Sequence, residues 1–538
     1  MKYLVILFVP GGAPYAFDKS LIGGSSAVGK CVSWACHFAR DGKPVLLCFT
    51  QDEAAVQEAA GDGVRLVARE QWTLAGVLDE MAALAKEGGA DSVVFSLADR
   101  PLLNDHLTEE VMKHHEHYVA EYTFADGYPE GLAPQVISAG TLSLLASLAH
   151  GQHKDAGESP FKAGSLWQLL QRDINSFEVE SVLAPKDFRM LRLDFSCSTK
   201  RGFLACKHLL DEAAPKGGGG ELSAAELSSL AECSVRVQRT VPAFFDVQIS
   251  GNCSSIAIYD PYPVEFKRVH GVLPTAQETP APHNMSLEQF ARLMDQVEEL
   301  SADAVVSLGS MGEPLLHPDL PRFVEEVLCH RGLRVLIETD GTLITDELAD
   351  RVAQVVRKAG PRAGGEEAIT WIVAVDAADE AMYERLVEGG SFARAVAAVP
   401  VLHSRFPRAV YPQFTRMKGN EDQLEAFYRY WSDKASPSGG AVIIQKYDHF
   451  CHTLPDRKPA DLSPLERLPC WHIKRDMTVL VDGSVPLCRE CMATSLGNAF
   501  TDGLLALWLK GESVVEDHIK GNYPQRCKDC DEYYTFNF

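Results

Sequence analysis

The chain has 538 residues, of which 46% are hydrophobic and 23% are charged, and its formal net charge is −23. This composition is ordinary for a folded protein, and no apolar run approaches the roughly 20 residues that span a membrane. The acidic excess disfavours nonspecific binding to nucleic acid or to an anionic membrane, because both would be repelled. We therefore expect neither partner, and the length leads us to expect three domains.

The chain begins with an apolar run at residues 1–9. The alternation of segments continues directly after it, which favours a first strand over a secretory signal. The 14 cysteines lack the dense, regular spacing of a disulfide scaffold. Such cysteines are typical of a reducing compartment and of metal or sulfur chemistry, so we expect a cytoplasmic protein.

Residues 1–213 alternate between strand-like and helix-like segments. The strand-like segments are 2–9, 43–50 and 91–103, and the helix-like segments are 28–40 and 74–88. This alternation predicts an α/β domain with a mostly parallel sheet. A run of four glycines then interrupts the pattern at 217–220. Because glycine offers no side chain to pack, and small polar residues follow, we predict a linker that contains a short helix at 214–238.

The segment 239–448 alternates more regularly. Its six strand-like runs are 244–250, 304–310, 333–340, 370–377, 409–417 and 441–448. Helix-like runs lie between most of them, at 286–300, 320–331, 346–358 and 422–431, and the first opens with Ser286 and Gln289 at the spacing of a capping box. The pattern predicts a partial (β/α)6 barrel, whose ligands should bind at the C-terminal ends of the strands.

Residues 449–538 are rich in cysteine, proline, glycine and aromatic residues, and five of the 14 cysteines follow residue 465. A small domain with so little apolar core usually needs a metal to stabilise it. Its candidate ligands are Cys470, Cys488, Cys527 and Cys530. Four thiolates suit either zinc or a 4Fe-4S cluster. Cys491, three residues after Cys488, could replace one of them.

Two motifs resemble one enzyme superfamily. The spacing Cys470, twelve residues, Gly483, four residues, Cys488 resembles the opening of the SPASM/twitch domain, which carries an auxiliary iron-sulfur cluster in many radical SAM enzymes. The stretch "GSMGEPLLHPDL" at 309–320 is similar to the second-strand motif of that superfamily. The resemblance implies that Gly312 and Glu313 help to hold the amino group of S-adenosylmethionine, and that the C-terminal cysteines bind a 4Fe-4S cluster rather than zinc.

The order of these parts, with "PCWHIKRDM" and the terminal "CDEYYTFNF", resembles the spiro-SPASM family of spirochaetes over nearly the entire chain. In that family a sugar-nucleotide transferase-like domain precedes the barrel, and "VVFSLADRPLL" is similar to its strand ending in Asp-x-Pro-Leu. The resemblance implies that Asp99 binds a divalent cation together with nucleotide phosphates, a role that suits a hard oxygen ligand. A nucleotide-sugar-binding protein or nucleotidyltransferase that uses the barrel only as a scaffold therefore stays an alternative.

The loop "NCSSIAIYDPYP" at 252–263 departs from the radical SAM pattern. Those enzymes bind their catalytic cluster with CxxxCxxC after the first strand, whereas here only Cys253 matches, and the other two ligand positions hold Ala257 and Asp260. Tyr259 matches the aromatic residue before the third cysteine. Alanine offers no ligand atom, and aspartate is a harder base that suits an iron-sulfur cluster poorly. We predict a degenerate loop with impaired cleavage of S-adenosylmethionine.

The alternative is an active radical enzyme that combines Cys253 with other ligands. Asp260 is one candidate, and Cys233 and Cys451 are cysteines that a distant part of the chain could supply. Such an enzyme would need an electron donor. Its substrate, a small molecule or a peptide, is not specified by the sequence, because side-chain positions in a barrel do not follow from spacing.

Overall fold

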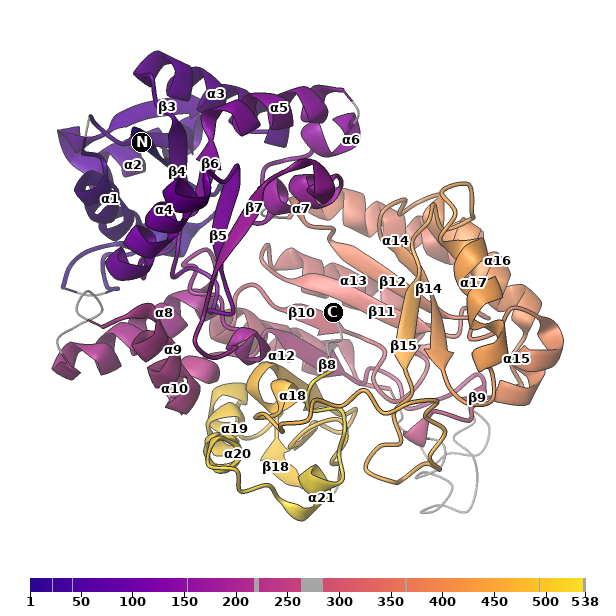
Figure 1. Ribbon diagram of the computed structural model, residues 1–538. Helices are drawn as coiled ribbons and strands as arrows, with labels where there is room; N and C mark the ends of the chain where they lie inside the picture. The colour runs from indigo at the N-terminus through magenta and orange to yellow at the C-terminus, as the bar shows by residue number, and fades with distance from the viewer. Residues whose placement is uncertain are drawn as a thin grey trace. The chain divides into compact units, whose positions relative to one another are not determined.

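The computed structural model describes residues 1–21, 23–40, 42–151, 153–216, 222–262, 284–362, 365–492 and 494–535. The chain divides into two compact units, a first unit at Met1–Thr240 and a second unit at Val241–Phe538 (Figure 1). Among the described residues, no helix combines the length and the apolar character needed to cross a membrane.

The first unit is built on a seven-stranded sheet in the order β3-β2-β1-β4-β6-β5-β7. Strand β6 runs antiparallel to β4 and β5, and the other neighbours are parallel, which confirms a mostly parallel α/β sheet. The strands are β1 (Tyr3–Phe8), β2 (Val45–Phe49), β3 (Arg65–Arg69), β4 (Ser92–Leu97), β5 (Tyr122–Asp126), β6 (Gln135–Ser138) and β7 (Val179–Leu183). The helices are α1 (Ala27–Phe38), α2 (Glu53–Ala60), α3 (Leu74–Gly88), α4 (Asp105–Tyr118), α5 (Ala139–His150), α6 (Lys154–Gly157), α7 (Ser165–Gln171), α8 (Lys200–Ala213), α9 (Ala224–Cys233) and α10 (Val235–Gln238).

The segment predicted as a linker, 214–238, is largely structured. Its four glycines lie outside the described residues, but α9 and α10 follow them, and a capping box of Ser223 and Glu226 begins α9. Leu227 and Val237 are buried in the core of the first unit. The short helix predicted in this segment is confirmed, and apolar side chains at helical spacing pack it against the first unit.

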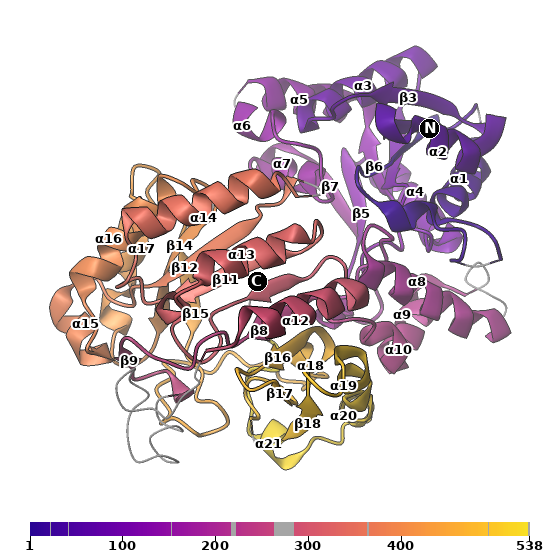
Figure 2. The same cartoon turned by 180° about the vertical axis from the view of Figure 1, so that it is seen from behind.

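The second unit contains a parallel sheet in the order β15-β14-β12-β11-β10-β8-β16. Six of its strands are those predicted for the barrel, which confirms the (β/α)6 pattern: β8 (Phe244–Val247), β10 (Val305–Ser307), β11 (Arg334–Thr339), β12 (Ile369–Ala374), β14 (Val410–Arg416) and β15 (Ile443–Lys446). The helices that follow are α12 (Leu287–Leu300), α13 (Leu320–Cys329), α14 (Asp346–Ala359), α15 (Glu380–Leu386), α16 (Phe392–His403) and α17 (Leu424–Trp431). Figure 2 shows α12, α13 and α14 side by side on one face of this sheet. Ser286 caps α12 with Gln289, as the sequence predicts.

The C-terminal segment also contributes to this sheet. Strand β16 (Asp476–Val479) runs parallel to β8 and forms the sheet's seventh strand, which the sequence analysis did not predict. The remaining elements of this segment are α18 (Trp471–Arg475), β17 (Ser484–Pro486), β18 (Ser495–Asn498), α19 (Leu504–Lys510), α20 (Glu512–Ile519) and α21 (Gln525–Lys528). The barrel and the cysteine-rich segment thus form one compact unit.

Candidate functional site

A cavity of about 240 Å³, here called the barrel cavity, is lined by residues at the C-terminal ends of the parallel strands and in the loops that follow them. This is where ligands bind in open parallel sheets and barrels. The cavity brings together the five residues that the sequence analysis assigned to cofactor binding: Cys253, Tyr259, Asp260, Gly312 and Glu313. Ala257, the second position of the degenerate motif, lines it too.

The loop after β8 is held by side-chain and backbone contacts. The hydroxyls of Ser254 and Ser255 both donate to Oδ2 of Asp340, each at 2.7 Å. Strand β9 (Ile256–Ala257) pairs antiparallel with β13 (Val387–Glu388), and this pairing fixes the backbone at Ala257. These contacts therefore define the shape of the loop.

The motif at 309–313 packs against the same loop. Gly312 has φ +149°, and a Cβ there would lie 2.1 Å from the carbonyl oxygen of Ser250, so no larger residue fits. The next backbone N–H, that of Glu313, donates to the carbonyl oxygen of Asn252 at 2.7 Å. The carboxyl group of Glu313 accepts from Oγ1 of Thr339 at 2.8 Å. Burial, followed by the nearby charge of Asp340, raises the pKa of Glu313 to about 8.

The immediate surroundings of Cys253 favour its neutral thiol. Burial raises the pKa of Cys253, and the carboxylates of Asp260, Glu313 and Asp340 raise it further. Burial also raises the pKa of Asp260 to about 6, although the N–H of Tyr262 donates to its Oδ1 at 2.9 Å. These neighbours favour the neutral thiol of Cys253, whereas a bound metal would favour the deprotonated forms of both groups.

Tyr259 is fixed by its hydroxyl group. The hydroxyl donates a hydrogen bond to Oδ2 of Asp376, and burial raises the tyrosine pKa well above its usual value. Asp376 is itself buried, and its Oδ1 accepts from the N–H of Thr415 at 2.6 Å. The tyrosine ring therefore has a fixed position at the edge of the cavity, and its hydroxyl stays protonated.

Cys253 is the one cysteine among the described residues that line the barrel cavity. Of the two cysteines considered as distant ligands, Cys233 is exposed in the first unit, and Cys451 lines a different pocket of the second unit. The cavity thus lacks the three thiolates that a radical SAM catalytic cluster takes from its protein. The described residues do not fit such a cluster.

The second pocket, here called the cysteine pocket, contains all four predicted auxiliary ligands. Its six cysteines are Cys451, Cys470, Cys488, Cys491, Cys527 and Cys530. Cys491 lies three residues after Cys488 and is an alternative ligand by its spacing, whereas no spacing motif marks Cys451 as a member of this group. Cys451 arrives there on a turn in which Phe450, Cys451 and His452 have φ values of 49°, 51° and 66°. Such left-handed conformations are uncommon outside glycine and persist only where the surroundings impose them.

The donor set of the cysteine pocket fits an iron-sulfur cluster. Such clusters take thiolates from the protein, and four of them are enough for one 4Fe-4S cluster. Among the described residues, the group of three potential ligands with donor atoms all within 4.8 Å of one another is Asp448, His449 and Asp531, and it does not include these cysteines.

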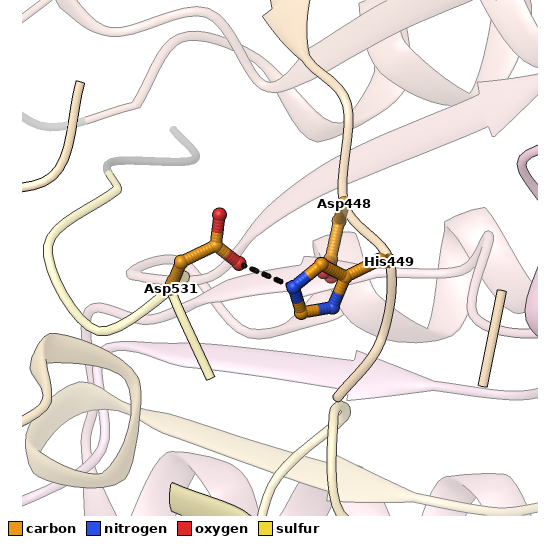
Figure 3. A group of neighbouring side chains, drawn as sticks. All are labelled: Asp448, His449 and Asp531. Atoms are coloured by element: carbon orange, nitrogen blue, oxygen red, sulfur yellow. Dashed lines mark ion pairs between the residues drawn. The ribbon is translucent and has the colours of Figure 1, made fainter. Parts of the chain in front are cut away.

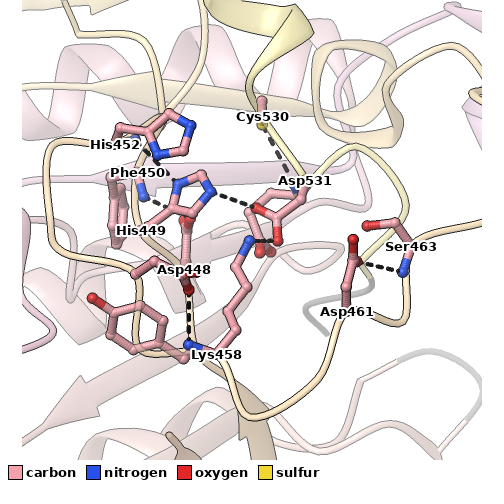
Figure 4. Close-up of polar contacts among 12 residues, drawn as sticks. Asp448, His449, Phe450, His452, Lys458, Asp461, Ser463, Cys530 and Asp531 are labelled. Atoms are coloured by element: carbon pink, nitrogen blue, oxygen red, sulfur yellow. Dashed lines mark hydrogen bonds and ion pairs between the residues drawn. The ribbon is translucent and has the colours of Figure 1, made fainter. Parts of the chain in front are cut away.

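Asp448, His449 and Asp531 lie close together, and His449 forms an ion pair with Asp531 (Figure 3). Nε2 of His449 lies 3.7 Å from Oδ1 of Asp531. Nζ of Lys446 lies 2.8 Å from Oδ2 of Asp531, and Lys458 forms a further ion pair with the same carboxylate (Figure 4). The ammonium groups of Lys446 and Lys458 already neutralise the charge of Asp531, so a metal ion would have to displace them. The network instead fixes the residue next to Cys530.

Asp99 follows β4 in the first unit, as the resemblance predicts, but it is only 1% exposed. Its Oδ2 accepts hydrogen bonds from the hydroxyls of Ser196 and Ser198. Its Oδ1 has no hydrogen-bond partner among the described residues. A cation that bridges nucleotide phosphates needs an open face on its carboxylate ligand, so a cation-binding role for Asp99 stays a prediction.

Comparisons with known proteins agree with the motifs. The family model for the radical SAM superfamily matches residues 265–430, and the model for the SPASM iron-sulfur cluster-binding domain matches residues 470–531. An uncharacterised protein of Treponema pallidum (strain Nichols) is 36% identical over 386 residues, which are 70% of this chain and 100% of the relative. The chain belongs to the radical SAM/SPASM family. The radical SAM match begins after the loop that carries Cys253, Ala257 and Asp260.

Two solved structures with similarity to this radical SAM/SPASM chain have low scores. Streptococcus suis SuiB bound to its precursor peptide SuiA has a TM-score of 0.40 at 12% identity, covering 61% of this chain and 83% of SuiB. A cytidylyltransferase from Leptospira borgpetersenii has a TM-score of 0.34 at 13% identity, covering 43% of this chain and 93% of that protein. At these scores the similarities carry no inference about function.

Proposed function

We propose that this chain is an iron-sulfur protein of the radical SAM/SPASM family that carries an auxiliary cluster in the cysteine pocket and is impaired in the reductive cleavage of S-adenosylmethionine. The single observation that carries the proposal is the lining of the barrel cavity, in which Cys253 is joined by Ala257 and Asp260 at the spacing of CxxxCxxC. One thiolate cannot hold a cluster that needs three protein ligands.

The auxiliary cluster would be held by Cys470, Cys488, Cys527 and Cys530 and would supply a centre for electron transfer. Burial raises the pKa of Cys470 to about 12 and that of Cys527 to about 11. Bound iron would offset this effect, because a metal favours deprotonated ligands. The 14 free cysteines also suit a reducing, cytoplasmic compartment.

The barrel cavity retains features that suit a ligand such as S-adenosylmethionine. The carboxyl group of Glu313 is held in place by Thr339, and the backbone at Gly312 and Asn252 is tightly packed. A neutral Glu313 can donate a hydrogen bond, and an incoming ammonium group would favour its ionised form. This pocket therefore supports ligand binding even where the cluster ligands are missing.

Restoring the motif tests the proposal. In the variant Ala257→Cys with Asp260→Cys, anaerobic reconstitution should raise the iron content from about four to about eight per chain, because each complete 4Fe-4S cluster adds four. With dithionite and S-adenosylmethionine, only this variant should release 5′-deoxyadenosine. The matched control is Ala257→Ser with Asp260→Ser, which changes the same positions without adding thiolates.

A wild-type protein that holds about eight irons and releases 5′-deoxyadenosine as fast as the restored variant would overturn the proposal. That result would favour the alternative of an active enzyme with Cys253 and unorthodox ligands. A restored variant that holds only about four irons would show that residues 253–260 do not form an eroded cluster loop.

A further inference from the structure

The barrel cavity is lined by an excess of carboxylates. Its lining includes six acidic side chains and two basic ones, Lys446 and Arg489. The acidic residues are Asp246, Asp260, Glu313, Glu338, Asp340 and Asp448. Lys446 does not offset this excess, because its Nζ already pairs with Asp531 and Glu532. The guanidinium group of Arg489 is thus left to offset the negative charge of the acidic lining residues.

Arg489 reaches this cavity from the C-terminal segment, next to Cys488. Its Nε lies 3.2 Å from Oε1 of Glu490, and its charge also acts on Asp246 and Glu338. A single guanidinium group therefore interacts electrostatically with several carboxylates at once. Burial raises the pKa of Asp246 and that of Glu338, and Arg489 opposes this effect in both cases.

Asp246 has a buried carboxyl group that is only partly paired. It lies in β8, is 6% exposed and lines the cavity. The side chains of Ser310 and Ser307 interact with this carboxyl group and lower its pKa, but its Oδ2 has no hydrogen-bond partner among the described residues. A buried carboxylate oxygen without a partner is costly in free energy, and such atoms in native proteins call for a specific explanation. A positive group on a bound molecule would provide the missing interaction.

The geometry disfavours a metal ion as that positive group. Among the described residues, the carboxylates of Asp246 and Glu338 do not belong to a group of three ligand atoms within 4.8 Å of one another. A divalent ion needs several oxygen ligands at about 2.0–2.6 Å, which places those oxygens close together. An organic cation, in contrast, can interact with carboxylates that lie further apart, and a cavity of about 240 Å³ can hold one.

We infer that the barrel cavity binds a substrate that carries an ammonium or guanidinium group, and that Asp246 and Glu338 hold this group. The inference rests on the proposed function in one respect, namely that the barrel cavity is a ligand site. It concerns the carboxylates at β8 and β11, whereas the resemblance assigns S-adenosylmethionine to Glu313.

The test uses three probes with the same five-carbon chain and different charges: 1,5-diaminopentane, 1,5-pentanediol and glutarate. Isothermal titration calorimetry on the anaerobically reconstituted full-length protein should detect binding of the diamine only. Glu338→Gln and Asp246→Asn should each weaken diamine binding by roughly 10- to 100-fold, because each removes a charge-assisted hydrogen bond. Glu347→Gln, the same chemical change at an exposed position in α14, should leave binding unchanged.

Circular dichroism and the iron content show whether each variant is folded. If one of the two carboxylate variants does not fold, the other still tests the effect of removing a carboxylate on diamine binding. Equal binding of all three probes, or diamine binding that is unchanged in both Glu338→Gln and Asp246→Asn, would overturn the inference. A parallel titration with S-adenosylmethionine separates the two proposals. If the protein binds the diamine but not S-adenosylmethionine, S-adenosylmethionine is removed as a ligand from the proposed function and the inference stands. If the protein binds S-adenosylmethionine but not the diamine, only the inference is overturned.

Discussion

The barrel cavity and the cysteine pocket lie in the same compact unit but differ in their sulfur ligands. The pocket collects six cysteines, whereas the cavity has Cys253 alone among its described lining residues. The loop that carries Cys253 is nevertheless well held, through Asp340 and the contact between Asn252 and Glu313. The loop around Cys253 is thus positioned by serine hydroxyls, a carboxylate and backbone contacts, whereas the cysteine pocket is distinguished by its thiols. Family membership therefore predicts the fold more securely than the chemistry.

The largest effect is expected from removing a ligand in the cysteine pocket. Cys470→Ala should reduce the iron content of the reconstituted protein from about four per chain to near zero, because a 4Fe-4S cluster needs all of its thiolates. Iron analysis together with the absorbance of the cluster would measure this loss. Cys329→Ser, at an exposed cysteine of the same unit, is the control and should keep its iron. If Cys470→Ala keeps about four irons, the predicted ligand set is wrong.

A second prediction concerns pH and the barrel cavity. The pKa of Glu313 is about 8 in the folded protein against an ordinary value of 4.5, so the stabilisation from its neutral form is complete below pH 4.5 and is lost as the pH rises through 8. Removing the charge with Glu313→Gln should therefore stabilise the protein at pH 9 by roughly 5 kcal/mol relative to the wild type. Near pH 5 this advantage should be absent.

Thermal unfolding of the wild type, Glu313→Gln and the exposed control Glu347→Gln between pH 5 and pH 9 would measure the effect. Parallel melting curves for the wild type and Glu313→Gln across this range would contradict it.

A third, smaller effect is expected from Tyr259→Phe. This change removes the hydrogen bond to Asp376 and leaves a buried carboxylate oxygen without its donor. The loss should destabilise the protein by about 1–3 kcal/mol, measurable as a lower unfolding midpoint in urea. The same substitution at the exposed Tyr428 should have almost no effect. Equal midpoints for the two variants would mean that the hydrogen bond contributes no net stability.

The smallest effect on iron content is expected from Cys451→Ala. Four other cysteines of the pocket are predicted to hold the cluster, so the variant should still bind about four irons per chain. A hydrogen bond from the Cys451 thiol lowers the pKa of Cys530, and the variant loses this interaction while keeping its iron. Iron analysis that gives near zero for Cys451→Ala would instead make Cys451 a ligand.

The six barrel strands could be predicted because both faces of a parallel sheet are covered, which produces continuous apolar runs such as 333–340. Strand β16 was missed because its four residues, Asp476–Val479, are too few to show a period. The antiparallel direction of β6 could not be predicted either, since an apolar run does not encode direction. Gly312 and Glu313 were found because a local motif marks them.

The charged lining of the cavity could not be predicted from the sequence. Asp246, Glu338 and Arg489 come from segments far apart in the chain, and only the tertiary fold brings them to one cavity. Arg489 is also adjacent to Cys488, so its position in the sequence suggests a role in the cysteine pocket. No spacing rule connects residues that meet across a parallel sheet and a separate C-terminal segment.

The pairing of β16 with β8 has a consequence for the order in which the second unit forms. Asp476 lies opposite Phe244 in this ladder. One edge of the sheet therefore pairs with residues that come more than two hundred positions later in the chain. During synthesis, β8 would expose an unpaired edge until the cysteine-rich segment leaves the ribosome. Contacts of such long sequence separation form slowly, because a large loop must close first. Maturation of the cysteine pocket and completion of the barrel sheet are therefore expected to be late and mutually dependent events.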